Sequence, residues 1–290
     1  MAERDDQGRK HAPVAAWLLL APGLLWLIWF FFIPLYTLGR MSLSSSPSRF
    51  AEPVFNWHWD NFDTAFSSFG EQFLHSFVYA VAATLLALVI AYPLAYFIAF
   101  RGGRWKNLLL GLVVVPFFTN FLIRTLAWKT ILGDQGTLVT LLRDVGLLSS
   151  GGTLLRTPAA VVGGLTYNFL PFMVLPLYVS LEQVDPRLIE AASDLYANRV
   201  LSFVRVTLPL SLPGVFAGVL LTFIPAMGDF INAQLLGTPR QYMIGNVIQS
   251  RFLELTDYPT AAALSFILMA IILLILPIYA RAMGTEKLTG

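Results

Sequence analysis

Six long apolar stretches alternate with shorter polar connections along the chain. They cover about residues 14–38, 74–100, 108–128, 158–181, 212–236 and 260–283. Each is long enough to cross a membrane as a helix, because about 20 residues rising about 1.5 Å each span the hydrocarbon core of a bilayer. The pattern predicts an all-α integral membrane protein with six transmembrane helices.

The same pattern suggests how the chain is divided. Residues 1–13 form an N-terminal tail, 14–73 the first helix and an outer loop, 74–283 a core of five helices, and 284–290 a C-terminal tail. Basic residues precede the first apolar stretch, as in a signal peptide, but the stretch is too long for a signal sequence and lacks a small-residue cleavage site. We therefore expect the first helix to be retained.

Basic residues predict the orientation, because they favour the cytoplasmic ends of membrane helices. With a cytoplasmic N-terminus, 11 of the 19 lysines and arginines lie on the inner side, 7 on the outer side and Arg124 within a span. The strongest contribution comes from the short turn 101–106, which carries Arg101, Arg104 and Lys106. Both termini and the loop 182–211 are therefore expected in the cytoplasm.

Composition agrees with a membrane protein and excludes several other classes. Hydrophobic residues make up 57% of the chain and charged residues 12%, which is typical of a protein embedded in a lipid bilayer. A net charge of +2 without a basic stripe argues against a nucleic-acid partner. The absence of cysteine excludes disulfides and thiolate metal sites and leaves the redox compartment undetermined.

Motifs of phosphate-binding loops, hydrolases and metalloproteases are absent. The lysines and histidines fall outside any such pattern: Lys10, Lys106, Lys129, Lys287, His11, His58 and His75. We therefore expect no catalytic site, no metal site and no cofactor in this chain.

The loop 182–211 carries a short amphipathic pattern between two apolar stretches. Asp185 is a favourable N-cap and Pro186 suits the first helical position. Apolar Ile189, Ala192 and Tyr196 are predicted on one stripe, with polar residues on the remaining surface: Arg187, Glu190 and Asp194. The pattern predicts a surface helix that contacts something outside the membrane.

Within this loop, the run Glu190-Ala191-Ala192-Ser193-Asp194-Leu195-Tyr196 is followed by Val206-Thr207-Leu208-Pro209. It resembles the EAA loop of permease subunits in binding-protein-dependent ABC importers. The resemblance implies a type I importer transmembrane domain over 74–283, in a bacterial cytoplasmic membrane, with a second related permease, two cytoplasmic ATPases and an extracytoplasmic solute-binding protein as partners. ATP and magnesium would bind the ATPase. The implied ATPase-coupling residues are Arg187, Glu190, Ala191, Ala192, Asp194, Leu195 and Tyr196.

Tyr196 departs from this family pattern, which usually has glycine at that position. Glycine permits a left-handed backbone or the close approach of another chain, and tyrosine favours neither. We expect the turn to fall at Asn198 instead, because asparagine tolerates the left-handed region. The ring of Tyr196 is then expected either in a recess of the ATPase or against the permease itself.

Several further strings resemble spermidine/putrescine permeases, and they lie at 91–97, 116–124, 170–178, 225–228 and 243–248. The alternatives are permeases for iron, sulfate or molybdate, which share much of this layout. A proton-coupled secondary transporter or a membrane scaffold is also compatible with part of the pattern. The identity of the solute, and whether the pore contains a defined solute site, are not determined by the sequence.

Polar residues within the predicted spans are candidates for a substrate pathway, because charge at membrane depth is costly. Asp229 is the only carboxylate well inside a predicted span, and Arg124 is the only comparable cation. Two interpretations stay open: the two residues form a structural pair, or Asp229 attracts a cationic solute. In the second case, hydrogen-bonding groups come from Asn120, Tyr167 and Asn168. For Asn168, a role in holding helices together is the alternative.

Overall fold

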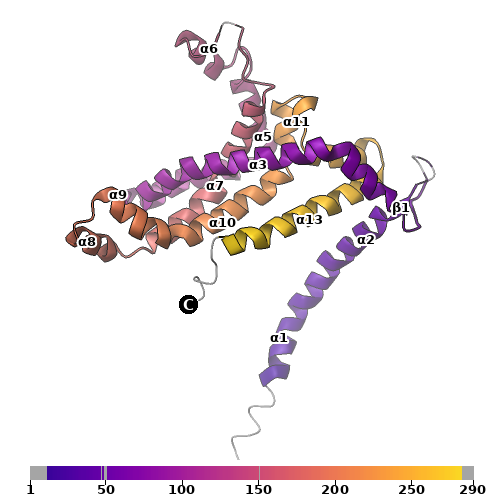
Figure 1. The fold of residues 1–290 in the computed structure, drawn as a ribbon, viewed down its shortest axis with the longest axis horizontal. Coiled ribbons are helices and arrows are strands. Elements are labelled where there is room, and N and C mark those ends of the chain that lie inside the picture. The colour runs from indigo at the N-terminus through magenta and orange to yellow at the C-terminus, as the bar shows by residue number, and fades with distance from the viewer. Residues whose placement is uncertain (1–11, 47, 49–50, 150, 283–290) are drawn as a thin grey trace, which may run out of the picture.

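The computed structural model describes residues 12–46, 48, 51–149 and 151–282, and most of them are helical. Five helices in this part are long and apolar enough to cross a membrane, and a bent pair of helices is a candidate sixth span. Figure 1 shows the long helices α3, α7, α10 and α13 side by side as one elongated bundle. The predicted all-α membrane architecture is thus confirmed.

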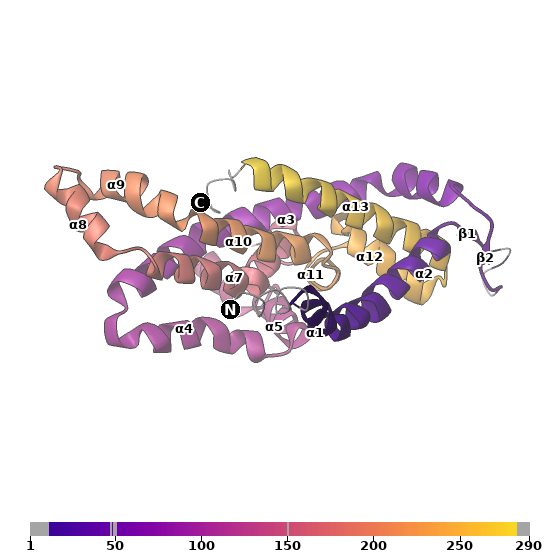
Figure 2. The same cartoon turned by 90° about the horizontal axis from the view of Figure 1, so that it is seen from below.

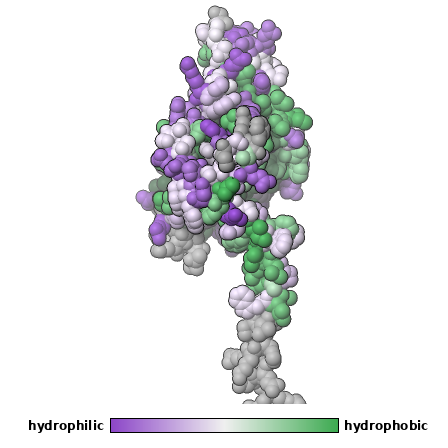
Figure 3. Space-filling view, turned by 90° about the vertical axis from the view of Figure 1, so that its right-hand side faces the viewer, coloured by the Kyte–Doolittle hydropathy of each residue, from purple (hydrophilic) through white to green (hydrophobic). Residues whose placement is uncertain are grey.

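The first span is one continuous helix made of α1 (Ala12–Leu27), a π-helical turn (Ile28–Phe32) and α2 (Ile33–Ser42). Its C-terminal half contacts α13, while α1 extends away from the bundle (Figures 1 and 2). None of the residues in its most apolar window is buried, and Figure 3 shows apolar atoms along the helix where it leaves the body. Such a helix needs lipid or another subunit around it.

The predicted outer loop 39–73 contains more regular structure than its polarity suggests. A short antiparallel hairpin pairs β1 (Ser44–Ser45) with β2 (Val54–Phe55). The next helix, α3 (Asp60–Arg101), begins 14 residues before the predicted span and is kinked at Phe69. The amide of Asn61 anchors this extension by donating to the carbonyl oxygens of Ser42 and Ser44.

Small residues allow the central helices to approach closely. On α3, a fully buried stripe of alanines faces α7 (Pro158–Glu182) and α10 (Leu208–Met227). On α10, a Cβ at Gly214 would lie 2.6 Å from the carbonyl oxygen of Pro176 on α7. Small-residue contacts of this kind are the usual means of helix association in membranes. The alanine stripe consists of Ala80, Ala83, Ala87, Ala91 and Ala95.

The third span was predicted as one helix over 108–128, and this is wrong. The chain forms a 3-10 turn (Gly103–Trp105), α4 (Lys106–Val114), a second 3-10 turn (Val115–Phe118) and then α5 (Phe121–Ile131), which is bent from the preceding segment by 95°. The backbone at Thr119 is extended, and Asn120 begins the new helix. Beyond α5, α6 (Thr137–Asp144) lies away from the bundle (Figure 1).

The fifth span also differs from the predicted 212–236. After the separate helix α8 (Pro186–Asp194), the span begins earlier than predicted, at Arg199. It consists of α9 (Arg199–Ser202), a π-helical turn (Phe203–Thr207) and α10, and the continuous helix ends at Met227. A separate short helix, α11 (Ile231–Leu236), follows after a break. The chain then runs through a 3-10 turn (Pro239–Gln241), α12 (Ile244–Gln249), a π-helical turn (Ser250–Glu254) and α13 (Tyr258–Ala282).

Candidate functional site

The predicted surface helix in the loop 182–211 is confirmed as α8. Its N-terminus is capped by Asp185, whose Oδ1 accepts a hydrogen bond of 2.9 Å from the backbone N–H of Arg187. Pro186 occupies the first helical position, where a missing N–H costs nothing. Figure 1 places α8 and α9 together at the end of the bundle opposite the β hairpin.

The α8 surface combines charge with exposed apolar groups. Ile189 is half-buried, as the predicted stripe requires, while Glu190 is exposed and forms no ion pair with another described residue. Leu195, just after the helix, is 81% exposed. Uncovered apolar side chains beside charged ones are typical of protein interfaces. Of the predicted coupling residues, Ala192 is half-buried and the others are exposed: Arg187, Glu190, Ala191, Asp194, Leu195 and Tyr196.

Tyr196 forms the turn that was expected at Asn198. Its φ is +62°, in the left-handed region, while Asn198 is extended and caps α9 by accepting a hydrogen bond from the N–H of Leu201. The N–H of Tyr196 donates to the carbonyl of Ser193, and that of Ala197 to the carbonyl of Ala192. This is the Schellman pattern, which requires the left-handed residue directly after the C-cap.

Tyr196 is 98% exposed, so its side chain does not pack against the rest of the described chain, and α8 ends before Tyr196 can join the predicted stripe. Replacing it by glycine relieves about 1–2 kcal/mol of backbone strain in both the free and the bound chain. Because the strain is relieved equally in the free and the bound chain, it does not change the binding free energy. A change in binding then reports the loss of the aromatic ring. If Tyr196 contacts the ATPase that the resemblance implies, we expect Tyr196→Gly to weaken recovery of that ATPase in pull-downs, because a buried aromatic ring contributes about 1.5–3 kcal/mol. Tyr196→Phe is the control, and equal recovery with both variants would reject a contact through the ring.

A second group of candidate residues lies where α5, α7 and α11 meet. Asn168 on α7 is 1% exposed, and its amide Nδ2 donates to Oγ1 of Thr125 at 3.1 Å and to Oδ1 of Asn232 at 3.0 Å. The N–H of Asn232 in turn donates to Oδ1 of Asp229 at 2.8 Å. Asn168 therefore joins three helices, as the interhelical interpretation proposed. Its own Oδ1 and the Nδ2 of Asn232 are buried without a hydrogen-bond partner.

Asp229 was predicted to lie inside a helical span, and this is wrong. It sits in the break between α10 and α11 and is 7% exposed. A break with irregular backbone is tolerated at membrane depth only where protein or a water-filled cavity surrounds it. Asp229 is therefore a buried carboxylate at the point where the helix is interrupted.

The other candidate pathway residues do not converge on Asp229. Asn120 is exposed, and its Oδ1 accepts from the N–H of Leu122, so it caps α5. Arg124 and Tyr167 line one hollow on the side of α5. The centroids of the Tyr167 and Trp128 rings are 5.2 Å apart.

The possible ion pair between Arg124 and Asp229 is not present. Among the described residues, no carboxylate lies within 4.0 Å of the Arg124 guanidinium. That group lies instead 5.7 Å from the ring centroids of Phe117 and Phe121. The pairing was predicted for Arg124 in one straight span, whereas the residue lies on α5, which is bent by 95° from the preceding segment.

Three buried polar residues of this region were missed by the sequence analysis. Thr125 and Asn232 contact Asn168, while Asn246 donates from Nδ2 to the carbonyl of Phe230 and accepts at Oδ1 from the N–H of Met243. The spacing of Asp229 and Asn232, three residues apart after a glycine, was a signal for a capped helix start. Thr125 and Asn246 carried no comparable local signal.

The break at Asp229 is supported by a close backbone contact from α12. A Cβ at Gly245 would lie 2.5 Å from the carbonyl oxygen of Gly228 and 2.9 Å from that of Asp229. We expect Gly245→Ala to destabilise the protein by about 1–3 kcal/mol, since backbone must shift, and to lower transport. Gly228→Ala is the matched control, because its Cβ would meet nothing within 4 Å. Thermal unfolding of both variants checks this, and equal midpoints would contradict it.

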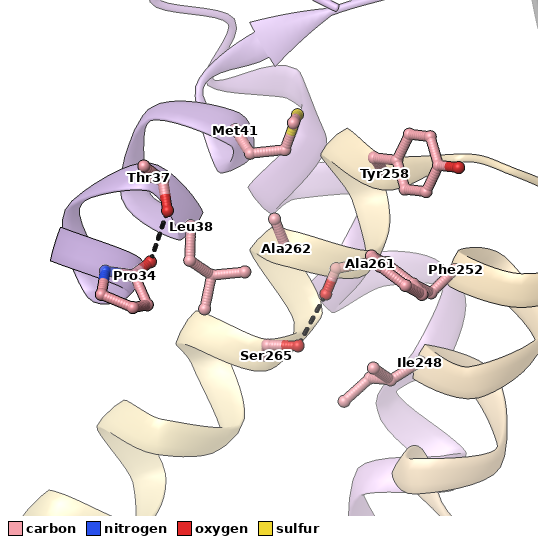
Figure 4. A pocket seen from close by; sticks show the side chains of 10 residues that line it. All are labelled: Pro34, Thr37, Leu38, Met41, Ile248, Phe252, Tyr258, Ala261, Ala262 and Ser265. Atoms are coloured by element: carbon pink, nitrogen blue, oxygen red, sulfur yellow. Dashed lines mark hydrogen bonds between the residues drawn. The ribbon is translucent and has the colours of Figure 1, made fainter. Parts of the chain in front are cut away.

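An apolar groove between α2 and α13 is visible in Figure 4. The hydroxyl of Thr37 donates to the carbonyl of Pro34, and that of Ser265 to the carbonyl of Ala261, so both are satisfied within their own helices. The remaining lining is apolar or aromatic, including Leu38 and Phe252. The groove therefore lacks the charged groups that would recognise a polar solute.

The sequence of this chain is similar to those of membrane components of transport systems. Residues 87–283 match the family described as binding-protein-dependent transport system inner membrane component. The spermidine/putrescine transport system permease protein PotB of Escherichia coli (strain K12) is 41% identical over 259 residues, which cover 89% of this chain and 94% of that protein. PotB of Haemophilus influenzae is 42% identical over 260 residues, covering 89% and 90%.

Solved structures show the same fold at lower sequence identity. A bacterial alginate ABC transporter in complex with an alginate pentasaccharide-bound periplasmic protein aligns with a TM-score of 0.69 at 19% identity, covering 99% of both chains. A second structure, of a bacterial ABC transporter involved in alginate import, aligns with a TM-score of 0.67 at 20% identity and covers 95% of this chain and 96% of that one.

Proposed function

Because this chain belongs to the family of inner membrane components of binding-protein-dependent transport systems, we propose that it forms half of the translocation pathway of an ATP-driven polyamine importer. The observation that carries the proposal is the identity of 41% over 89% of the chain to a spermidine/putrescine permease. Spermidine and putrescine are the proposed solutes.

The buried polar cluster supports a cationic solute. Asp229 is a buried carboxylate in a helix break, and its Oδ1 accepts a hydrogen bond from the N–H of Asn232. A carboxylate at membrane depth is costly unless a partner or a passing cation compensates it. An ammonium group of a polyamine is such a cation.

The position of α8 supports coupling to a separate ATPase. Its charged and apolar surface lies at one end of the bundle, and none of the residues that the structure describes forms an ion pair with Glu190. We propose that this surface docks on the ATPase, which binds ATP and magnesium and carries out hydrolysis, so the permease itself is not an enzyme. Movement of α8 would pass through the π-helical turn Phe203–Thr207 directly into α10.

The remaining partners follow from the same assignment. The solute-binding protein would dock at the opposite end of the bundle, near the β hairpin, and an alginate importer of the same fold was solved with its periplasmic protein bound. The exposed first helix is suited to lipid or to a second, related permease. The inner-side excess of basic residues supports cytoplasmic termini, although both tails lie largely outside the described residues.

Co-purification followed by an ATPase assay tests this proposal. A tagged form of this chain is expected to bring down an ATPase and a second permease, and the reconstituted complex should hydrolyse ATP faster when spermidine-loaded binding protein is added. A proton-coupled transporter or a scaffold protein would give no solute-stimulated hydrolysis. Stimulation by sulfate or iron, with none by spermidine, would keep the importer and reject the polyamine.

A further inference from the structure

Arg124 is a buried cation for which the described part of the chain provides no acidic partner. The residue is 7% exposed, its Nε is shielded from solvent without a hydrogen-bond acceptor, and the guanidinium lies over the rings of Phe117 and Phe121. These rings attract the cation weakly, by about 0.5–2 kcal/mol each. A buried charge without a carboxylate is costly, so a partner from outside the chain is expected.

Arg124 lines a hollow of about 370 Å³ on the side of α5, whose other lining residues are apolar or aromatic except for Thr119. No acidic residue contributes to this lining. Among the residues that line the hollow, Ile123 is 60% exposed and Ile131 is 37% exposed. A concave apolar surface with one buried arginine is typical of the centre of a protein interface.

Two other occupants fit less well. A polyamine is itself positively charged, so Arg124 would repel it. A lipid phosphate would leave the exposed apolar side chains around the hollow facing a polar headgroup. A side-chain carboxylate can pair with the Arg124 guanidinium in bidentate geometry, while apolar groups of the same partner cover the apolar lining.

We propose that the hollow at Arg124 receives a carboxylate side chain of the companion permease, which pairs with Arg124 when the two permeases assemble. This inference rests on the proposed function, because it requires a companion permease. The pair would hold α5, which is bent by 95° from the segment before it, against the other half of the pathway.

Charge reversal tests the proposed pair. With a tagged companion, Arg124→Glu is expected to reduce the recovered amount of this chain at least about ten-fold, because it places two carboxylates together. Lys129→Glu is the matched control: Lys129 is exposed on the same helix, and the same charge change there should alter recovery less than about two-fold. Replacing membrane-embedded acidic residues of the companion by arginine, one at a time, should identify one that restores recovery with Arg124→Glu.

Cross-linking provides a measurement that does not depend on assembly of the Arg124→Glu variant. The chain contains no cysteine, so Ala127→Cys, which lines the hollow, introduces a single thiol. The companion carries one cysteine at a time, placed beside each of its membrane-embedded acidic residues in turn, and oxidation should join the two chains at one of these positions. The proposal would be overturned if Ala127→Cys forms disulfides only with a second copy of this chain. It would also be overturned if the thiol stays free although this variant assembles with its companion as the wild type does.

The remaining outcomes also decide the matter. If Arg124→Gln leaves assembly intact and raises only the KM for spermidine, the hollow faces the solute and the inference is wrong. If the wild type assembles only in vesicles containing phosphatidylglycerol, and Arg124→Gln also assembles in pure phosphatidylcholine, a lipid phosphate is the partner and the inference is wrong. If wild-type protein recovers no permease or ATPase at all, the proposed function fails instead.

Discussion

Glu190→Lys is expected to abolish ATP-driven uptake, with a loss of at least about ten-fold, while the protein stays folded in the membrane. Glu190 is exposed on α8 and forms no ion pair with another described residue, so its replacement breaks no contact in that part of the chain. Reversing its charge at a docking surface places like charges together, which costs several kcal/mol at an interface. Uptake of labelled spermidine and recovery of the ATPase are the two measurements.

The control for this variant is Glu52→Lys. Glu52 is also exposed, but it lies beside the β hairpin at the opposite end of the bundle. The same charge change there should leave ATPase recovery unchanged. Normal transport and normal assembly of Glu190→Lys would show that α8 is not the coupling element.

Asp229→Asn is expected to lower uptake by about ten-fold or more without loss of expression, because it removes a buried charge from the proposed pathway. The variant preserves the local structure: the asparagine Oδ1 can still accept the hydrogen bond from the Asn232 N–H that begins α11. Because Arg124 does not pair with Asp229, no cation is left without its partner. Uptake of labelled spermidine and putrescine in membrane vesicles measures the effect.

A comparison with Asp229→Ala separates charge from structure. Alanine removes both the charge and the cap, which costs about 0.5–2 kcal/mol at a helix start. If Asp229 attracts the solute, both variants transport poorly. If Asp229→Asn transports normally and only Asp229→Ala is impaired, Asp229 is part of the scaffold.

Hydropathy predicted the membrane helices well but not their interruptions. The fifth apolar stretch continues beyond Asp229, so its hydropathy alone gives no reason to end the helix at Met227. The break is specified by the Asp229 cap and by the contact with Gly245 from a later segment. The bend before α5 likewise depends on Pro116 and the Asn120 cap, whose effect average hydropathy does not register.

The surface helix α8 was predictable because its signals are local. Asp185 and Pro186 mark its start within two residues, and the structure contains both features. The left-handed Tyr196 was not predictable in this way, because tyrosine seldom adopts that conformation and Asn198 was the more favourable choice. The cluster around Asn168 depends on tertiary contacts between α5, α7 and α11, so a single sequence could supply only candidate members.

Solute uptake by cells that lack this chain, compared with cells in which it is restored, tests the central claim most directly. The account predicts that restoration recovers saturable, ATP-dependent uptake of labelled spermidine or putrescine and that uptake of sulfate stays unchanged. Recovery of sulfate or iron uptake without any polyamine uptake would contradict it.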